Sequence, residues 1–595
     1  RNAIIRKLHA VETLGSTTVI GSDKTGTLTK NEMTVKLVYD GSRTYEVTGS
    51  GYEPKGGFFH EGLPLAPTEE KKVLEVLRIG ALCNESNIFE EDGCCKVDGD
   101  PTEGALIVSA MKAGLGIEEQ KEQYRQAAII PFESERGYMA TLHQHRGRKY
   151  IFVKGAPEKV LEMCAGTLNG GEADKKKIAA VATEFAREGL RVLAFACREA
   201  PGDLEELARP EAEKDLLFAG LQGMIDPPRP EVIKAVEGCR KAGIRVVMIT
   251  GDHAVTASAV AKLIGIAGEA PAVLSGQEME SISDEELMHH CRSTSVFARV
   301  SPQHKMRITR QLIAQGEIVA VTGDGVNDAA ALKAAHIGIA MGRCGTDVAR
   351  EASDMVIADD NFASIFAAVE EGRVVYENIR KVVLFLVSCG LGELLAITAA
   401  LLLGMPIPYL PAQILWLNLV TNGLQDVALA FEPGEKDILN RPPRSPRERI
   451  LSRLMLERTL LMGIIMAAGT LFLFSSSLRA GVSLEKARTV ALTTMVFFQF
   501  YQAGNCRSEN RSLFSMHPVG NPLLFFSMIA AFFAQLAVIY VPALQWVFRT
   551  EPITALEWGR IALVASTIIV AVELDKWRRK RKGLRGAEAE SCVQR

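Results

Sequence analysis

Residues 17–29 read TTVIGSDKTGTLT, in which a short β-branched run at 17–20 ends at a turn rich in Gly and Asp. Two further runs have the same character, RVVMI at 245–249 and EIVAV at 317–321, and each ends at a similar turn. Amphipathic helical patterns lie between them, at 232–242 and 257–263. This alternation predicts a parallel sheet with helices on both faces. Sites in such folds lie beyond the carboxyl ends of the strands.

The composition excludes several classes of protein. The chain has 595 residues, a formal net charge of −3 and 47% hydrophobic residues. A near-neutral chain has no basic field for a nucleic acid, so we expect no nucleic-acid partner, and the apolar content is too high for a disordered protein. Its 11 cysteines contain no CxxC pair, so neither a disulfide framework nor a zinc or redox motif is indicated.

The turns after the predicted strands carry residues suited to phosphoryl transfer. Asp23 follows the first strand, and a carboxylate in this position can form an acyl phosphate. Asp324 and Asp328, four residues apart in TGDGVND, offer hard oxygen ligands for Mg²⁺. Thr250 offers a hydroxyl and Lys305 a cation for the developing charge. DKTGT on its own could be an ordinary turn, and the absence of a GxxxxGK[ST] loop excludes the Walker type of ATP site.

Four motifs together resemble the P-type ATPases, the ion pumps of the haloacid dehalogenase superfamily. They are SDKTGTLT at 22–29, KGAPE at 154–158, MITGD at 248–252 and TGDGVNDAAAL at 322–332. The resemblance implies an α/β haloacid dehalogenase-like (Rossmannoid) phosphorylation domain at 1–36 and 225–365. It also implies an inserted α+β nucleotide-binding domain at 37–224, then an α-helical transmembrane domain at 366–585 and a tail at 586–595.

The resemblance also implies roles for individual residues. Asp23 is the phosphorylated residue, Thr250 and Lys305 bind the transferred phosphoryl group, and Asn327 supports the metal site. The cofactor Mg²⁺ is held by Asp23, the Thr25 carbonyl, Asp324 and Asp328, and the expected catalytic residues are Asp23, Thr250, Lys305 and Asp324. Phosphatases of the superfamily carry an Asp where this chain has Thr25. Without that local base the acyl phosphate is expected to be long-lived.

By resemblance, ATP is the substrate and the inserted domain binds it. An aromatic ring can stack on adenine, and Lys and Arg can contact phosphates. Each such residue could otherwise be an ordinary core aromatic or surface charge. Arg136-Gly137-Tyr138 departs from the calcium pumps, which commonly place Arg-Lys there. The expected ATP-binding residues are Glu103, Phe132, Arg136, Lys154, Arg191, Thr250, Gly251, Asp252, Arg299, Lys305 and Asn327.

The character of the chain changes after residue 381. A bilayer core requires about 20 mostly apolar residues per helix, and six runs meet or approach that length, which predicts six spans in a lipid bilayer. Buried helices of a soluble protein are the alternative. The runs are 382–403, 410–431, 459–478, 489–506, 522–541 and 558–574.

Basic residues alternate between the connections. The connection at 404–409 has none, whereas the next loop and the tail are basic. This pattern predicts that the soluble part, that loop and the C-terminus are cytoplasmic. The expected location is the plasma (inner) membrane of a prokaryote. The basic residues are Lys436, Arg441, Arg444, Arg447, Arg449 and Arg453 in the loop, and Lys576, Arg578, Arg579, Lys580, Arg581 and Lys582 in the tail.

Polar residues inside the spans are candidate ligands of a transported cation. Glu393, Asn418, Thr421 and Asn422 are the candidates, although polar residues in membranes also serve as interhelical hydrogen bonds. LWLNLVTNGL at 415–424 and DILNRPPR at 437–444 resemble the calcium-pump branch, and Asp426 is a further carboxylate in the membrane part.

Three positions depart from the calcium pumps: Gly390 replaces an Asn, Asn422 an Asp and Gln499 a Glu. Fewer carboxylates neutralise less of the charge of a desolvated divalent cation. The resemblance makes Ca²⁺ the leading expectation and the missing carboxylates favour one ion site over two, with Na⁺, H⁺ or another divalent cation as alternatives.

The chain also differs from the family in extent. It begins Arg-Asn-Ala, and no Thr-Gly-Glu actuator motif or group of four preceding spans is present, which suggests the C-terminal part of a pump. As given, it is expected not to complete a transport cycle. Two other functions remain open, a phosphatase of the same superfamily anchored in the membrane and an inactive regulatory fragment. Thr25 in place of the second Asp argues against the phosphatase.

Overall fold

Asp23 lies directly after a central strand of an eight-stranded sheet. The computed structural model describes residues 1–595 except 8, 92–93, 169, 269–270, 445–449 and 594–595, and it gives no account of the side chains of 94 and 582–593. The described chain divides into two compact units, residues 1–13 with 17–368 and residues 14–16 with 369–595. Arg447, Arg449 and the side chain of Lys582, which entered the charge argument, lie outside the described parts.

The first sheet joins strands that are far apart in the sequence. Its order is β1 (Ala3–Ile5), β20 (Met355–Ile357), β19 (Ile337–Met341), β18 (Val319–Gly323), β2 (Val19–Ser22), β15 (Arg245–Ile249), β17 (Val296–Ala298) and β16 (Val273–Ser275). All pairs are parallel except β1 with β20, an antiparallel edge pair that the sequence pattern did not predict. The ends of β2, β15 and β18 therefore lie side by side, and this arrangement positions the candidate site.

Helices pack on this sheet over an apolar core. β-Branched and aromatic residues of the strands, such as Val19, Phe297 and Val321, pack against Ile308 and Leu312 of one helix. The helices of this region are α1 (His9–Gly15), α8 (Pro230–Lys241), α9 (Ala254–Leu263), α10 (Gly276–Ser281), α11 (Asp284–His290), α12 (Pro302–Ala314), α13 (Ala329–Ala334) and α14 (Asp347–Ala352). The mixed α/β character expected for this part of the chain is confirmed.

A second sheet, antiparallel except for the parallel pair of β12 with β14, occupies the stretch between β2 and β15. The chain enters it through β3 (Thr34–Tyr39) and leaves through β14 (Leu216–Ile225), and these two strands pair with each other. The other strands are β4 (Thr44–Val47), β5 (Phe58–His60), β6 (Leu63–Leu65), β9 (Arg125–Glu133), β10 (Tyr138–His145), β11 (Arg148–Gly155), β12 (Cys164–Thr167) and β13 (Arg191–Ala200), and β7 (Asn87–Glu91) forms a separate hairpin with β8 (Cys94–Asp98). The helices are α2 (Lys71–Leu82), α3 (Pro101–Lys112), α4 (Ile117–Gln123), α5 (Pro157–Met163), α6 (Lys175–Arg187) and α7 (Arg209–Ala212).

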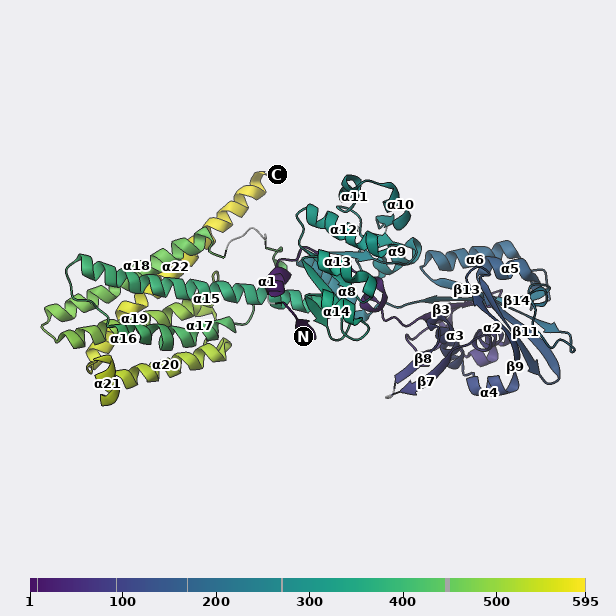
Figure 1. Ribbon diagram of the computed structural model, residues 1–595, viewed down its shortest axis with the longest axis horizontal. Coiled ribbons are helices and arrows are strands. Elements are labelled where there is room, and N and C mark those ends of the chain that lie inside the picture. Colours follow the sequence, from purple (N-terminus) through teal and green to yellow (C-terminus); the bar gives the residue numbers. More distant parts are fainter. Residues whose placement is uncertain (8, 92–93, 169, 269–270, 445–449, 594–595) are drawn as a thin grey trace. The chain divides into compact units, whose positions relative to one another are not determined.

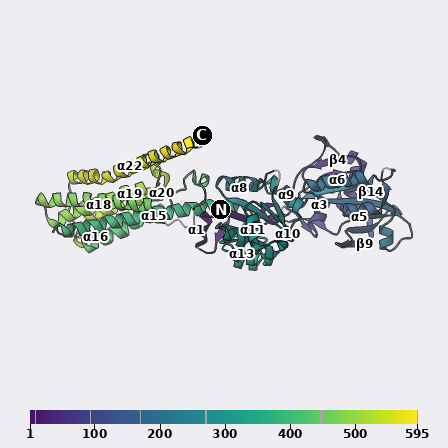
Figure 2. The ribbon, with the colours of Figure 1, turned by 90° about the horizontal axis from the view of Figure 1, so that it is seen from above.

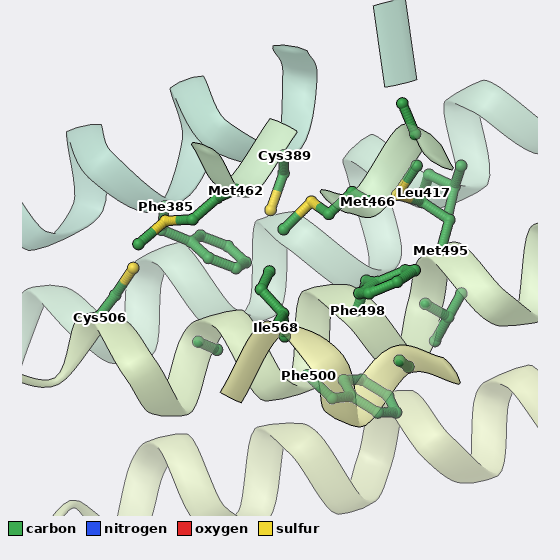
Figure 3. Packing of buried hydrophobic residues seen from close by; sticks show 14 of the residues in the cluster. Phe385, Cys389, Leu417, Met462, Met466, Met495, Phe498, Phe500, Cys506 and Ile568 are labelled. Atoms are coloured by element: carbon green, nitrogen blue, oxygen red, sulfur yellow. The ribbon is translucent and has the colours of Figure 1, made fainter. Parts of the chain in front are cut away.

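The second unit is a bundle of helices (Figures 1 and 2). Its elements are α15 (Phe362–Leu402), α16 (Pro411–Trp416), the π-helical turn η4 (Leu417–Asn422), α17 (Gly423–Ala430), α18 (Arg453–Arg479), α19 (Leu484–Cys506), α20 (Pro522–Tyr540), α21 (Pro542–Phe548) and α22 (Ala555–Val593). Its core consists of aromatic, aliphatic and sulfur-containing side chains from α15, α18, α19 and α22, including Phe385, Cys389, Met462, Met466, Phe498, Cys506 and Ile568 (Figure 3).

Four helices within the described residues are long and apolar enough to cross a membrane. They are Phe362–Leu402, Arg453–Arg479, Pro522–Tyr540 and Ala555–Arg581. The other two expected spans have a different form: 410–431 is divided among α16, η4 and α17, and 489–506 lies in α19, which buries Gln499, Gln502 and Asn505. The break shortens the helices of 410–431, and the buried amides lower the hydropathy of 489–506. Six membrane spans therefore remains a prediction.

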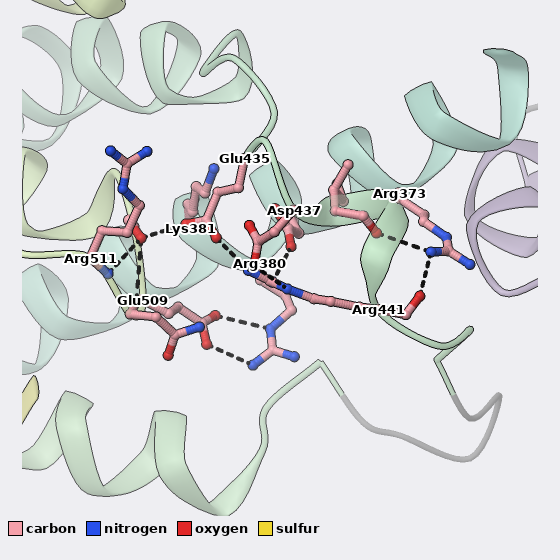
Figure 4. Close-up of polar contacts among 12 residues, drawn as sticks. Arg373, Arg380, Lys381, Glu435, Asp437, Arg441, Glu509 and Arg511 are labelled. Atoms are coloured by element: carbon pink, nitrogen blue, oxygen red, sulfur yellow. Dashed lines mark hydrogen bonds and ion pairs between the residues drawn. The ribbon is translucent and has the colours of Figure 1, made fainter. Parts of the chain in front are cut away.

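The loop after α17 is tied to α15 by ion pairs (Figure 4). Arg441 contacts Glu377 at 3.0 Å, Glu435 at 2.6 Å and Asp437 at 2.8 Å. Arg380 of α15 contacts both carboxylate oxygens of Glu509 at 3.1 Å. A cavity of about 560 Å³ lies among these residues. It contains none of the predicted site residues, and the ion pairs around it hold the loop against the helix.

Candidate active site

Asp23 lies in a turn whose backbone conformation depends on glycine. Its backbone N–H donates to the Thr322 hydroxyl at 3.0 Å, which connects the ends of β2 and β18. One Asp23 carboxylate oxygen accepts the N–H of Lys24 at 2.7 Å. Gly26 then has φ +73°, a left-handed conformation that glycine adopts without strain. The strand end and the turn together hold the carboxylate of Asp23 at the carboxyl-terminal edge of the sheet, where β2, β15 and β18 end.

Three carboxylates converge at this edge. Oxygen atoms of Asp23, Asp324 and Asp328 all lie within 4.8 Å of one another. Asp328 is held by backbone N–H groups, because its Oδ2 accepts from Asp324 at 3.2 Å and from Gly325 at 3.1 Å. A Cβ on Gly323 would lie 2.5 Å from the Cβ of Asp328, so only glycine allows this approach. Clustered carboxylates are the hard oxygen ligands that Mg²⁺ prefers, and these residues fit such an ion.

Lys305 provides the positive charge of the cluster. It lies near the start of α12, and its ammonium contacts Asp23 Oδ2 at 2.6 Å and Asp328 Oδ1 at 2.8 Å. Burial alone would lower the pKa of Lys305, but the two carboxylates outweigh it and raise the pKa. Burial, followed by the charges of Asp23 and Asp328, raises the pKa of Asp324. One ammonium thus bridges two of the three carboxylates, Asp23 and Asp328.

The residues after β15 lie on the neighbouring strand end. The buried Thr250 hydroxyl accepts the N–H of Asp252 at 3.2 Å, and the carboxylate of Asp252 pairs with the ammonium of Lys24, next to Asp23. Arg299 has φ +51° and donates its backbone N–H to the Asp252 carbonyl at 2.9 Å. Gly251 is exposed in the turn between Thr250 and Asp252.

The other expected residues of this edge occupy its turns. Thr25 follows Lys24, and Asn327 is exposed beside Asp328. Sequence reasoning missed the pair of Lys24 with Asp252. It also missed Asp226, which accepts the Thr29 hydroxyl at 2.5 Å and whose pKa burial raises. Lys24 stands inside the quoted motif, but its partner lies 228 positions away, so no local signal could identify the pair.

The second sheet gathers most of the residues expected to bind ATP. Lys154 of β11 contacts Glu103 at the start of α3 at 2.6 Å, and both side chains are largely buried. Arg191 of β13 donates to the Thr102 hydroxyl at 3.1 Å, a neighbour that sequence reasoning missed. The structure therefore brings Glu103, Lys154 and Arg191 together by way of α3.

Phe132 lies near the end of β9, and Arg136 lies in the turn between β9 and β10. Phe132 is 49% exposed as a residue, which is compatible with stacking on an aromatic ligand. Arg136 contacts Glu133 at 3.1 Å and the Pro131 carbonyl at 2.6 Å. The strand register links this turn to the previous group, because Glu133 pairs with Tyr138 and Tyr138 with Gly155, next to Lys154.

The polar residues of the helical unit form one cluster around Glu393. This carboxylate is 5% exposed and accepts two amide N–H groups, from Asn418 at 3.1 Å and from Gln499 at 3.0 Å. The Thr421 hydroxyl lies 2.5 Å from Gln499 Oε1 and 2.6 Å from the Leu417 carbonyl. The π-helical turn η4 supplies Asn418, Thr421 and Asn422 to the cluster, and such turns are frequent at functional sites.

Two details of this cluster were not expected from the sequence. Gln499 was noted only as a departure from the calcium pumps, yet it joins Glu393 to Thr421. Asn422 donates weakly to Asn418 at 3.4 Å, and its buried Oδ1 has no partner among the described residues. Asp426 accepts the N–H of Val427. The cluster thus presents one carboxylate surrounded by neutral amides and a hydroxyl.

Comparison with known proteins places the chain. A model of "P-type ATPase, cytoplasmic domain N" matches residues 72–231, and one of "Cation transporting ATPase, C-terminus" matches residues 406–578. The calcium-transporting ATPase of Bacillus subtilis is 43% identical over 566 residues, which is 94% of this chain and 63% of that protein. The chain belongs to the P-type cation-transporting ATPases.

Other P-type ATPases give the same result. The cation-transporting ATPase pma1 of Synechocystis is 43% identical over 582 residues, with 94% of this chain and 63% of that protein covered. The calcium-transporting ATPase type 2C member 1 of Bos taurus is 38% identical over 595 residues, with 98% and 60% covered. The chain therefore spans less than two thirds of the length of these relatives, and its likeness to calcium-pump-type members confirms the resemblance found in the sequence.

Proposed function

We propose that the chain takes part in ATP-driven cation transport through an aspartyl phosphate on Asp23. The observation that carries this proposal is the bridge of Lys305 between Asp23 and Asp328, with Asp324 in the same cluster. A nucleophilic carboxylate, a buried cation and two further carboxylates are the parts that phosphoryl transfer requires. The names of the relatives add support, because each is a calcium- or cation-transporting ATPase.

In the proposed reaction, a carboxylate oxygen of Asp23 attacks the terminal phosphorus of ATP. The bond from that phosphorus to the bridging oxygen breaks, and ADP leaves. Lys305 and the Thr250 hydroxyl stabilise the charge of the transferred group. Asp23, Asp324, Asp328 and the Thr25 carbonyl would hold Mg²⁺, which would neutralise phosphate charge. Because Thr25 cannot act as a base, the acyl phosphate persists.

We propose the architecture that accompanies this chemistry. Residues 1–36 and 225–365 form a haloacid dehalogenase-like phosphorylation domain, and residues 37–224 bind ATP through Glu103, Phe132, Arg136, Lys154 and Arg191. The phosphorylation domain adds Gly251, Asp252, Arg299 and Asn327. Residues 366–585 form six membrane spans, followed by a tail at 586–595, with the soluble domains and the C-terminus in the cytoplasm of a prokaryote.

The transported cation is proposed to bind at Glu393, Asn418, Thr421 and Asn422. A buried carboxylate and amide oxygens can replace the hydration shell of a hard cation. We propose Ca²⁺, because two relatives are named calcium-transporting ATPases. Na⁺, H⁺ and another divalent cation are the alternatives, and ion-dependent phosphorylation tested with each cation separates them.

The experiment is labelling with γ-³²P-ATP and Mg²⁺. Label is expected on Asp23, stable in acid and released by hydroxylamine, and lost in Asp23→Asn. Asp203→Asn makes the same change at an exposed position and should keep the label. Label that persists in Asp23→Asn would overturn the proposal. Rapid loss of the wild-type label without any ion dependence would favour the phosphatase.

A further inference from the structure

The last helix carries a continuous exposed stripe that ends in cationic residues. Leu563, Val570, Leu574 and Trp577 of α22 are exposed by 73, 58, 58 and 54%, and their spacings of 7, 4 and 3 place them on one helical face. Arg581 continues the same face one turn beyond Trp577. The side chains thus change from aliphatic to indole to guanidinium within about two turns. This is the order found where a helix leaves the hydrocarbon of a bilayer for its headgroups.

The opposite face of the same segment is neutralised by the protein. Lys576 is buried and donates to the carbonyls of Asn505 at 3.3 Å and Arg511 at 2.9 Å. Arg579 pairs with Asp575 at 2.7 Å and with Glu457 of α18 at 3.0 Å. These two cations hold α22 against its neighbours.

Three cations of the segment have no such partner. Arg578, Lys580 and Arg581 are exposed, and among the described side chains no carboxylate lies within 4.0 Å of them. The guanidinium of Arg581 lies over the Trp577 ring, 4.0 Å from its centre. If α22 spans a bilayer, an indole followed within one turn by exposed cations is the arrangement expected at the level of the lipid headgroups.

We propose that Trp577, Arg578, Lys580 and Arg581 form a surface that binds the headgroups of anionic phospholipids. Charge complementarity selects this occupant, because unpaired cations beside the end of a membrane helix attract anionic lipids. Each such cation favours the anionic lipid by roughly fivefold at low salt, so three favour it by about 10²-fold. The inference requires only that α22 spans the bilayer, so its failure would leave the aspartyl-phosphate proposal untouched.

Tryptophan quenching tests the surface. The chain has four tryptophans, so W416F, W546F and W558F together leave Trp577 alone. The protein is reconstituted with brominated phosphatidylglycerol or brominated phosphatidylcholine at equal mole fraction. We expect a binding preference of tens to a hundredfold for the anionic lipid from the quenching curves, and a preference near one in 0.5 M salt.

Two further variants distinguish binding at this surface from a general effect of the positive charge of the protein. R578Q/K580Q/R581Q should abolish the preference, whereas K175Q/K176Q/K177Q removes the same charge from exposed lysines of α6 and should retain it. Lipid that copurifies with the chain carrying all its tryptophans gives a second measurement, and its anionic fraction should fall only in the first variant. Equal quenching by both lipids, or an unchanged preference in R578Q/K580Q/R581Q, would overturn the proposal.

Discussion

Replacement of Lys305 by Met tests the charge balance of the carboxylate cluster. The substitution keeps much of the side-chain volume but removes an ammonium that lies 2.6 Å from Asp23 and 2.8 Å from Asp328. The loss of a cationic donor aimed at the reacting phosphate typically costs about 10²–10³-fold in rate. We therefore expect the phosphorylation rate to fall by about that factor.

The same change should lower stability in a pH-dependent way. Removing one partner of a buried ion pair costs roughly 3–5 kcal/mol, and we expect about 3 because the side chains of Asp23 and Asp328 keep 21% and 10% exposure. The already raised pKa of Asp324 should rise further without the cation. A carboxyl group whose pKa is raised by folding lowers the stability of the folded state when it is charged. The loss of stability in Lys305→Met should therefore be present at pH 7 and shrink as the pH falls through the raised pKa of Asp324.

Rapid-quench phosphorylation and thermal unfolding at several pH values measure the two effects. Lys333→Met removes an exposed lysine of α13 and should change neither quantity. Binding of ADP, which lacks the phosphoryl group that Lys305 is expected to contact, should be preserved in Lys305→Met, because the Glu103–Lys154 pair is unaltered. Phosphorylation within about threefold of the unmodified chain, or a stability deficit that grows on acidification, would refute the reasoning.

Two further predictions concern the polar cluster of the helical unit. Glu393→Gln should abolish ion-stimulated phosphorylation while ATP binding, measured with a fluorescent nucleotide, stays unchanged; unaltered ion dependence would show that Glu393 is structural. Gln499→Glu places a second carboxylate where an amide now donates to Glu393 at 3.0 Å. It should increase apparent affinity for a divalent cation by tenfold or more relative to a monovalent one in the phosphorylation assay, and an equal change for both ions would count against a ligand role.

Local patterns in the sequence predicted the strand ends and the chemistry next to them. The run at 245–249 is a strand with those bounds, because β-branched residues followed by Thr-Gly-Asp indicate a buried strand and a turn. β2 and β18 begin at Val19 and Val319, two residues after the predicted starts, and continue to Ser22 and Gly323. The antiparallel edge strand β1 carries no such signal, since three residues are too few to show a period.

The sequence by itself determined the family and the residue types of the site, because both depend on short motifs. Tertiary structure decided which atoms meet. Lys305 reaches Asp23 across 282 positions, and Gln499 reaches Glu393 across 106. Both contacts form only because strand order and helix packing bring distant segments together. A hydrogen-bond partner at such a separation leaves no local pattern in the sequence. The motifs therefore predicted the chemistry of the site, but they could not predict the bridge formed by Lys305 or the two amides that donate to Glu393.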